Sequence, residues 1–335
     1  MSSCSSLVAF RWSRLVALLA LAALCGCSSI QVHLGMRAHI DKIPVTTMDA
    51  VLPHGPALAP GETAPLQVNF TTADGKTWVT EGAGKGKILW SDLTVTPTLV
   101  TFKKGKLTLR HDPRYSDGKI GHVEITVPSH PGLHAALDIP LRYTYPFKAV
   151  YSGSSGTPGM NGTDGINGTD GTPGSTDPNN PSAGGDGSDG TNGSDGQRGG
   201  DGGDGPPVNV VVTLRPGDHP LLQAEVSVPG RKPRYYLVDP DGGSLTIGSY
   251  GGDGGSGGKG GRGGRGGSGG IGTPNGNSGN NGSDGQDGLS GDSGRGGSIS
   301  ITTDPAVQPY LAAIHVSNPG GPKPVWLTQP VAPLW

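Results

Sequence analysis

The chain has 335 residues, of which 62 are glycine and only 5% are aromatic, so much of it lacks the side chains that build an ordinary apolar core. Its formal net charge of −2 excludes the basic balance that is typical of nucleic-acid-binding proteins. No run of adjacent basic residues indicates binding to lipid headgroups.

The first residues indicate an export signal. Arg11 and Arg14 precede the apolar segment LVALLALAALC, which at ~11 residues is too short to span a bilayer. The segment runs into LCGC (residues 24–27), which resembles the lipobox of bacterial lipoproteins. The resemblance implies a signal peptide over residues 1–26, lipidation of Cys27 and, with serine rather than aspartate at position 28, an outer-membrane or cell-surface location.

Cysteine usage agrees with this interpretation. Cys4, Cys25 and Cys27 are the only cysteines, and cleavage before Cys27 leaves a single thiol with no disulfide partner. A cleaved secretory signal with an incidental thiol is the alternative.

Residues 27–63 are rich in proline, histidine and small side chains and predict a tether with at most one early strand. Over residues 64–150, seven short runs with alternating polarity lie about ten residues apart and predict an antiparallel β-sandwich. Trp90 and Ser91 in an early strand, a hairpin at Lys104 and Gly105, and the alternating segment 121–127 resemble bacterial immunoglobulin-like domains. The resemblance implies a spacer or adhesive module. The expected fold class is therefore mostly β, with little α-helix.

Glycine then occupies every third position in four runs of equal length, residues 153–176, 184–207, 251–274 and 276–299. A random glycine-rich linker would not keep this period. The runs predict two glycine-triplet hairpins, over residues 153–207 and 251–297. The ordinary sequence between and after them, residues 208–250 plus 298–335, predicts one split β module.

Three structures fit glycine at every third position: an intramolecular bundle of polyglycine II helices, a collagen-like homotrimer, or a disordered chain. Few prolines occur in the runs, and TPNG (residues 273–276) and DPNNP (residues 177–181) are reversal signals, which favours a monomeric bundle with legs about 74 Å long at ~3.1 Å per residue. The runs resemble both polyglycine II proteins and bacterial collagen-like surface proteins.

Charged side chains concentrate at the third position of the triplets. The second run carries an acidic stripe and the third run a basic stripe of Lys259, Arg262 and Arg265, and the two stripes either face each other or remain solvated. Carboxylate oxygens also suit calcium, so the aspartates are candidate calcium ligands, although no tandem calcium-binding repeat is present. No other cofactor is expected. The acidic stripe consists of Asp186, Asp189, Asp195, Asp201 and Asp204.

No motif predicts catalysis. G-x-S-x-G at residues 254–258 follows from the triplet period, and His130 and His134 lie in a proline-containing turn rather than on one helix face. We therefore expect a non-catalytic, lipid-anchored cell-envelope protein with a structural or adhesive role. A calcium- or glycan-binding surface module is the alternative. The expected partners are the membrane and an unidentified surface partner but no nucleic acid, and a monomer is favoured over a homotrimer.

Overall fold

The computed structural model describes residues 28–82 and 85–335, and its fold is mostly β, as the sequence predicts. The chain divides into two compact units, with Tyr145 ending the first continuous stretch and Pro146 beginning the second. The signal peptide and Cys27 lie outside the described residues.

The first unit contains three three-stranded antiparallel sheets, with strand orders β1-β3-β4, β2-β7-β6 and β5-β8-β9. Its strands are β1 (Val45–Val51), β2 (Thr63–Pro65), β3 (Gln67–Thr72), β4 (Thr77–Val79), β5 (Thr94–Thr98), β6 (Val100–Lys103), β7 (Lys106–Leu109), β8 (Gly121–Thr126) and β9 (His134–Ile139). Short helices are α2 (Ser28–His33), η1 (Ile40–Lys42), η2 (Trp90–Asp92) and η3 (Pro113–Tyr115).

Alternation along the strands builds the apolar core of this unit. In β3, Val68 and Phe70 are fully buried while Gln67 and Asn69 point outward, as the period of two requires. Leu107, Ile125 and Ile139 enter the same core from other sheets.

Two features of this unit differ from the sequence analysis. The segment expected to be a tether contributes β1 and the buried side chains of Ile40 and Leu58, so it belongs to the core. Trp90 and Ser91 lie in the short helix η2 and not in a strand. The Trp90 indole donates to Glu81 O at 2.9 Å and packs over Gly105, whose positive φ of 74° forms the hairpin.

From Pro146 onward the chain forms a parallel sheet of order β10-β14-β16 and a mixed sheet of order β13-β12-β11-β15-β17. Strand β10 lies at residues that the sequence analysis placed in the first domain. The elements are β10 (Pro146–Ser152), β11 (Val208–Arg215), β12 (Leu221–Ser227), β13 (Arg234–Val238), β14 (Ser244–Tyr250), β15 (Ile299–Thr303), the 3-10 helix η4 (Pro305–Ala313), β16 (Ile314–Ser317) and β17 (Val325–Thr328).

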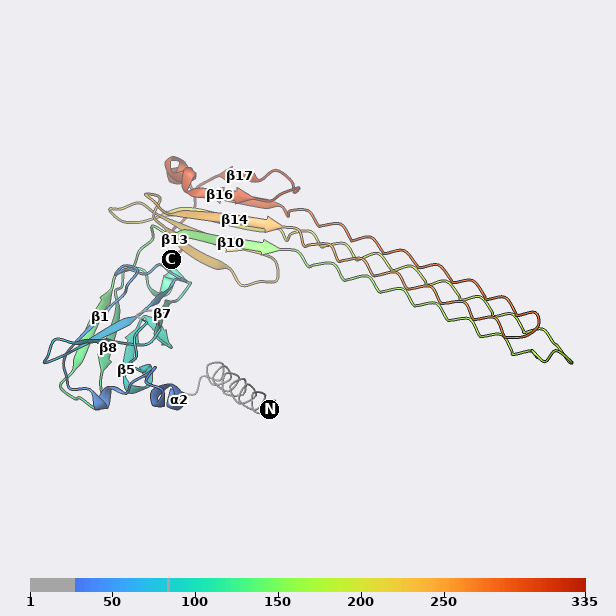
Figure 1. Cartoon of the computed structure of the whole chain (residues 1–335). Helices are drawn as coiled ribbons and strands as arrows, with labels where there is room; N and C mark the ends of the chain where they lie inside the picture. The colour runs from blue at the N-terminus through green and yellow to red at the C-terminus, as the bar shows by residue number, and fades with distance from the viewer. Residues whose placement is uncertain (1–27, 83–84) are drawn as a thin grey trace, which may run out of the picture. The chain divides into compact units, whose positions relative to one another are not determined.

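The four glycine-triplet runs extend from these two sheets as segments that lie side by side (Figure 1). We call them leg 1 (residues 153–176), leg 2 (184–207), leg 3 (251–274) and leg 4 (276–299), and together the four-leg array. Legs 1 and 3 continue from the parallel strands β10 and β14. Legs 2 and 4 likewise connect with β11 and β15, which are also parallel.

Candidate functional site

The four-leg array is held by main-chain hydrogen bonds between five pairs of legs. The first glycine of each triplet in leg 1 donates to leg 3, as Gly162 N–H does to Lys259 O at 2.7 Å, and this pair of legs is parallel. Leg 2 donates in the same way to leg 4. The pairs formed by legs 1 and 2, 2 and 3, and 3 and 4 are antiparallel, with N···O distances of 2.7–2.9 Å.

The pairing gives the array an inner and an outer pair of legs. Legs 2 and 3 each bond to three other legs, whereas legs 1 and 4 each bond to two. Leg 3 has glycine at the first and second positions of its triplets because both face neighbouring main chain. A Cβ on Gly261, for example, would lie inside van der Waals contact with Thr163 O of leg 1. The third positions of leg 3 are exposed and carry its larger side chains.

The strands set the register of the legs. Ser152 of β10 pairs with Tyr250 of β14, 98 residues further along the chain, and the same separation joins Asn161 to Lys259 within the array. In the other parallel pair, a separation of 91 residues is kept from Asp186 and Asn277 near the far end to Val208 and Ile299 in the strands. The β module and the array therefore share one register.

The acidic stripe of leg 2 binds main chain of leg 4. One oxygen of each predicted aspartate accepts a hydrogen bond from a second-position N–H, as Asp195 Oδ1 does from Gln286 N at 2.7 Å. The aspartates therefore do not face the cations of leg 3, which corrects the idea that the two stripes pair. The five bonds run from Asn277, Asn280, Gln286, Asp292 and Arg295 to Asp186, Asp189, Asp195, Asp201 and Asp204 at 2.6–2.8 Å.

Asparagines fill the same role, which the sequence analysis missed. Oδ1 of Asn192 in leg 2 accepts from Ser283 N at 2.8 Å, in the same row as the aspartates. In leg 1, the side-chain oxygens of Asn161 and Asn167 accept from main-chain N–H groups of leg 3, as those of Asp164 and Asp170 do. The sequence signal for this role is that Asn and Asp replace each other at the third position of the triplets. It indicates that the oxygen acceptor, and not the charge, is what these positions share.

The basic stripe lies between two rows of Asn and Asp side chains, one from leg 1 and one from leg 4. Lys259 Nζ contacts Asp287 Oδ2 of leg 4 at 2.6 Å. Arg262 N donates to Asp164 of leg 1, and the next residue, Gly263, donates to Asp284 of leg 4. Within residues 28–82 and 85–335 the side chains of Arg262 and Arg265 form no ion pair. Asp164 and Asp284 therefore flank Arg262. Arg265 is flanked instead by the uncharged side chains of Asn167 and Asn281.

Three pKa values in the array move with these contacts. The hydrogen bond from Asp292 N–H lowers the pKa of Asp201, with a further contribution from Arg198. Lys259 lowers the pKa of Asp287, assisted by the N–H of Gly260, while Asp287 in turn raises the pKa of Lys259. Each shift favours the charged form that makes the inter-leg contact.

The described part of the chain contains no group of three or more His, Cys, Asp or Glu side chains placed to hold a metal ion. The leg 2 aspartates are spaced along a row and each already serves a main-chain N–H. Among the same described residues no helix has the length and hydropathy needed to cross a bilayer.

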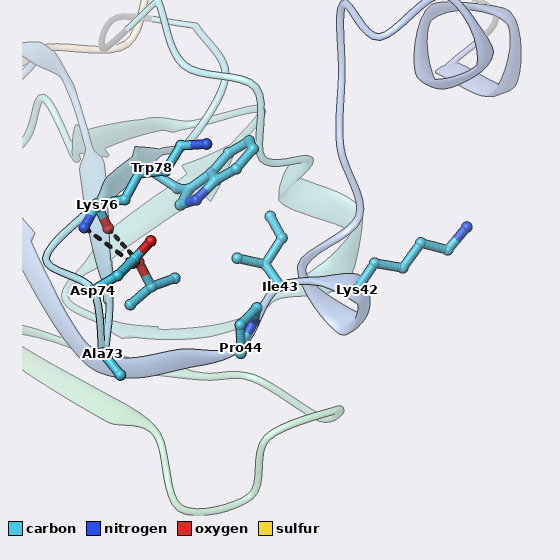
Figure 2. Close-up of a pocket in the computed structure, with 8 residues that line it drawn as sticks. Lys42, Ile43, Pro44, Ala73, Asp74, Lys76 and Trp78 are labelled. Atoms are coloured by element: carbon cyan, nitrogen blue, oxygen red, sulfur yellow. Dashed lines mark hydrogen bonds between the residues drawn. The ribbon is translucent and has the colours of Figure 1, made fainter.

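The first unit has an open pocket of about 360 Å³ beside Trp78 (Figure 2). Ile43 and Pro44 supply an apolar side, and Lys76 Nζ lies 4.6 Å from the centre of the Trp78 ring. Asp74 lines the pocket and accepts a hydrogen bond from the Thr72 hydroxyl, which is the main cause of its lowered pKa. The pocket combines an aromatic face with a few polar groups, a combination that suits a small polar ligand.

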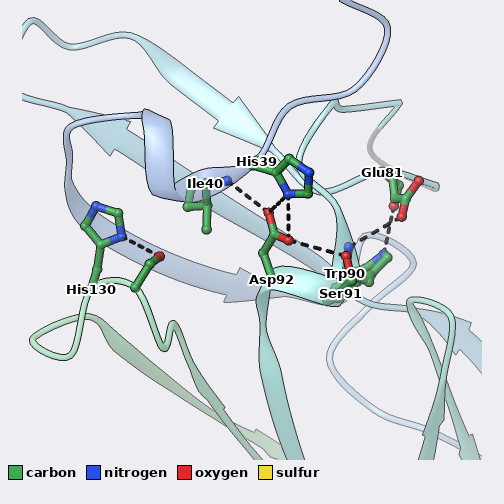
Figure 3. Close-up of polar contacts among 8 residues, drawn as sticks. His39, Ile40, Glu81, Trp90, Ser91, Asp92 and His130 are labelled. Atoms are coloured by element: carbon green, nitrogen blue, oxygen red, sulfur yellow. Dashed lines mark hydrogen bonds and ion pairs between the residues drawn. The ribbon is translucent and has the colours of Figure 1, made fainter. Parts of the chain in front are cut away.

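A second cluster in this unit pairs His39 with Asp92 (Figure 3). His39 Nδ1 lies 3.0 Å from Asp92 Oδ1, and Ile40 N–H donates to the same carboxylate. The Ser129 hydroxyl contacts His130, its chain neighbour, at 3.0 Å and belongs to a separate pair. The described contacts therefore do not form a continuous chain of serine, histidine and aspartate.

Comparisons with known proteins give no relative: no protein family, no curated protein and no solved structure matches this chain. The candidate site therefore rests on the structure of this chain alone. It is the four-leg array, whose inter-leg hydrogen bonds repeat from triplet to triplet.

Proposed function

We propose that the protein is a non-catalytic, lipid-anchored protein of the cell envelope that presents the four-leg array as a rod, in a structural or adhesive role. In this proposal Cys27 carries the lipid, an immunoglobulin-like first unit acts as a spacer, and the four legs form an intramolecular polyglycine II bundle.

The shared register of the strands and the legs carries this proposal. Ordering a backbone costs about 1–2 kcal/mol per residue, and a net hydrogen bond returns only about 0.5–1.5 kcal/mol, so a single leg would not stay ordered. Legs that start in register from paired strands need no search for alignment. Each bond formed then favours the next, which supports a rod of about 74 Å at ~3.1 Å per residue.

The array also provides little chemistry of its own. Its outward positions carry Thr, Ser, Asn and Asp side chains whose polar atoms mostly bond to neighbouring legs. A surface of this kind suits the presentation of a fixed, repetitive face at a distance from the membrane, rather than the turnover of a substrate.

A register-matched deletion tests the role of the rod. Removing residues 163–168, 189–194, 261–266 and 280–285 takes two triplets from every leg and preserves all five pairings, because these segments bond to one another. The rod should shorten by about 19 Å at ~3.1 Å per residue, seen by small-angle X-ray scattering, and surface attachment should weaken.

The matched control removes residues 163–167 alone, and because five is not a multiple of three, the remaining glycines of leg 1 fall out of phase with legs 2 and 3. This variant should lose the protection of array amides from hydrogen exchange, while the first unit stays folded. Full surface attachment by a variant without an ordered array would refute the proposed role.

The pocket beside Trp78 favours glycan binding as a second candidate function. The exposed part of an indole ring next to Asp74 and Lys76 is suited to a sugar ring with hydroxyl groups. Substituting Asp74 with Ala should then abolish retention on immobilised envelope glycan without changing the rod length. Unchanged retention would exclude this pocket.

A further inference from the structure

Four of the five Asn–Gly dipeptides of this chain lie in the four-leg array, and the fifth lies in the turn between legs 3 and 4. The triplet period causes this, because a third-position asparagine is always followed by the first glycine of the next triplet. The five pairs begin at Asn161, Asn167, Asn192, Asn275 and Asn281.

Asn–Gly is chemically labile because glycine has no side chain to hinder attack on the preceding residue. The glycine nitrogen attacks Cγ of asparagine, a C–N bond forms, the Cγ–Nδ2 bond breaks, and Nδ2 leaves as ammonia with the proton from the glycine nitrogen. Water then opens the resulting succinimide at either carbonyl and yields aspartate or isoaspartate. Asparagine is accordingly counted among the thermolabile residues.

The array restrains both reacting groups at the four pairs inside the legs. Asn161 Oδ1 accepts from Lys259 N at 2.8 Å, which holds the side-chain amide against leg 3. The attacking nitrogen, Gly162 N, donates to Lys259 O at 2.7 Å. Cyclisation requires the amide group to turn toward Gly162 N, so both bonds must break first.

The same two restraints recur at the other three inner pairs. The Asn167, Asn192 and Asn281 side chains accept from Arg265, Ser283 and Gly266 at 2.8–2.9 Å. The following glycines, Gly168, Gly193 and Gly282, donate to Arg265 O, Ser283 O and Gly264 O at 2.7–2.9 Å.

Asn275 is different. Like the four inner asparagines it is exposed, but it lies in the turn between legs 3 and 4, and its Oδ1 accepts from Gly272 N, three residues away in the same turn. Gly276 N still donates to Gly270 O, so only one restraint ties the pair to a neighbouring leg. Chain reversals at the end of an ordered segment open with the lowest free energy.

We propose that the array protects its four inner Asn–Gly pairs from deamidation and that Asn275 in the distal turn is the first site of this modification. Conversion of an inner asparagine to aspartate keeps the oxygen acceptor. Conversion to isoaspartate adds a carbon to the main chain and breaks the period of three, so it permanently marks an array that has opened.

The test incubates the intact chain at mildly alkaline pH, natively and in urea, and follows each asparagine by peptide mass spectrometry that resolves aspartate from isoaspartate. In the native protein the four inner sites should react at least ~10-fold more slowly than in urea, the factor that an opening free energy of about 1.4 kcal/mol gives. Asn275 should react fastest of the five.

A pair of neighbouring variants separates protection by the array from sequence effects. Gly199→Ala, whose Cβ would overlap leg 3, should accelerate the reaction at Asn161 and Asn192, whereas Gly200→Ser should not. Equal rates at the inner sites in native protein and in urea would overturn the proposal, as would an Asn275 that reacts no faster than the inner sites. Neither outcome depends on the lipid anchor or on adhesion.

Discussion

Adjacent glycines in leg 2 offer a sharp test of how closely the legs pack. Gly199 is buried at the first position of its triplet, and a Cβ there would overlap Gly255 O of leg 3 and lie 2.6 Å from Gly255 C. Gly200 follows it at the second position, where a Cβ would meet the Thr157 hydroxyl at 2.9 Å, a group that can rotate away. Leg 2 already has serine at the equivalent position 188.

The expected cost of Gly199→Ala follows from the bonds at that level. Displacing leg 2 at this level would break three hydrogen bonds, one from Gly199 N–H to Leu289 O of leg 4 and two from Gly255 and Gly258 N–H of leg 3 to Gly200 O and Gln197 O. At about 0.5–1.5 kcal/mol each the loss is about 1.5–4.5 kcal/mol. The alanine restricts the unfolded chain and returns about 0.4–1 kcal/mol, which leaves a net destabilisation of about 0.5–4 kcal/mol.

Native-state hydrogen exchange of peptides from residues 153–207 measures this cost locally. Gly199→Ala should reduce protection by about 2-fold to several hundred-fold, and by about 40-fold at the middle of that range, since 1.4 kcal/mol corresponds to tenfold. Gly200→Ser should stay within about threefold of the original protein, in line with small surface effects of about 0.5 kcal/mol. If the two variants have the same protection, the legs are not packed as described.

Three further predictions concern the anchor, the acceptor row and pH. Cys27→Ala should move the protein from the membrane fraction to the soluble fraction, and a protein that stays bound would refute lipidation at this residue. Asn192→Ala should destabilise the array by about 0.5–1.5 kcal/mol because Ser283 N–H loses its acceptor, whereas Asn192→Asp should not; equal unfolding midpoints would show that the row contributes nothing. The folded-state pKa of Asp201 lies below its ordinary value of 3.8, so the stability it contributes is complete above pH 3.8 and is lost as the pH falls through the folded-state pKa. Asp201→Asn keeps the oxygen acceptor but does not titrate. It should therefore reduce the loss of array stability at acid pH, measured by hydrogen exchange.

The sequence predicts the triplet legs well because glycine's period and the turn residues are local signals. It also contains a signal for the arrangement, since leg 3 has paired glycines in every triplet but its last and leg 1 has one glycine per triplet, which matches an inner and an outer position. The charge of Asp186 and its neighbours does not predict their role as hydrogen-bond acceptors, because that role depends on the oxygen that Asn and Asp have in common.

Other features had no local signal. Ile40 and Leu58 are buried, but prolines and histidines between them interrupt any alternation that would mark a strand-rich segment. The parallel pairing of β10 with β14 joins residues 98 apart and depends on the legs between them. Non-local pairing of this kind follows from tertiary packing, and sequence periodicity does not report it.

The central claim is that one chain folds its four runs into a register-locked array, and distances between spin labels test it most directly. Met160 O of leg 1 accepts from Gln197 N of leg 2, and Leu289 O of leg 4 accepts from Gly199 N, two residues further along leg 2. Ile166 O of leg 1 accepts from Thr191 N, which lies eight residues before Gly199 in leg 2. In a chain that lacks residues 1–27 and with them all native cysteines, labels at Met160→Cys and Leu289→Cys should therefore lie about 6 Å apart along the rod, and labels at Ile166→Cys and Leu289→Cys about 25 Å apart.

Pulsed electron paramagnetic resonance on labelled protein diluted with unlabelled chain should give two narrow distributions, the second at the longer distance. Broad, overlapping distributions would indicate disordered runs. Distances that vanish on dilution would indicate legs from different chains, and either result would contradict the intramolecular array.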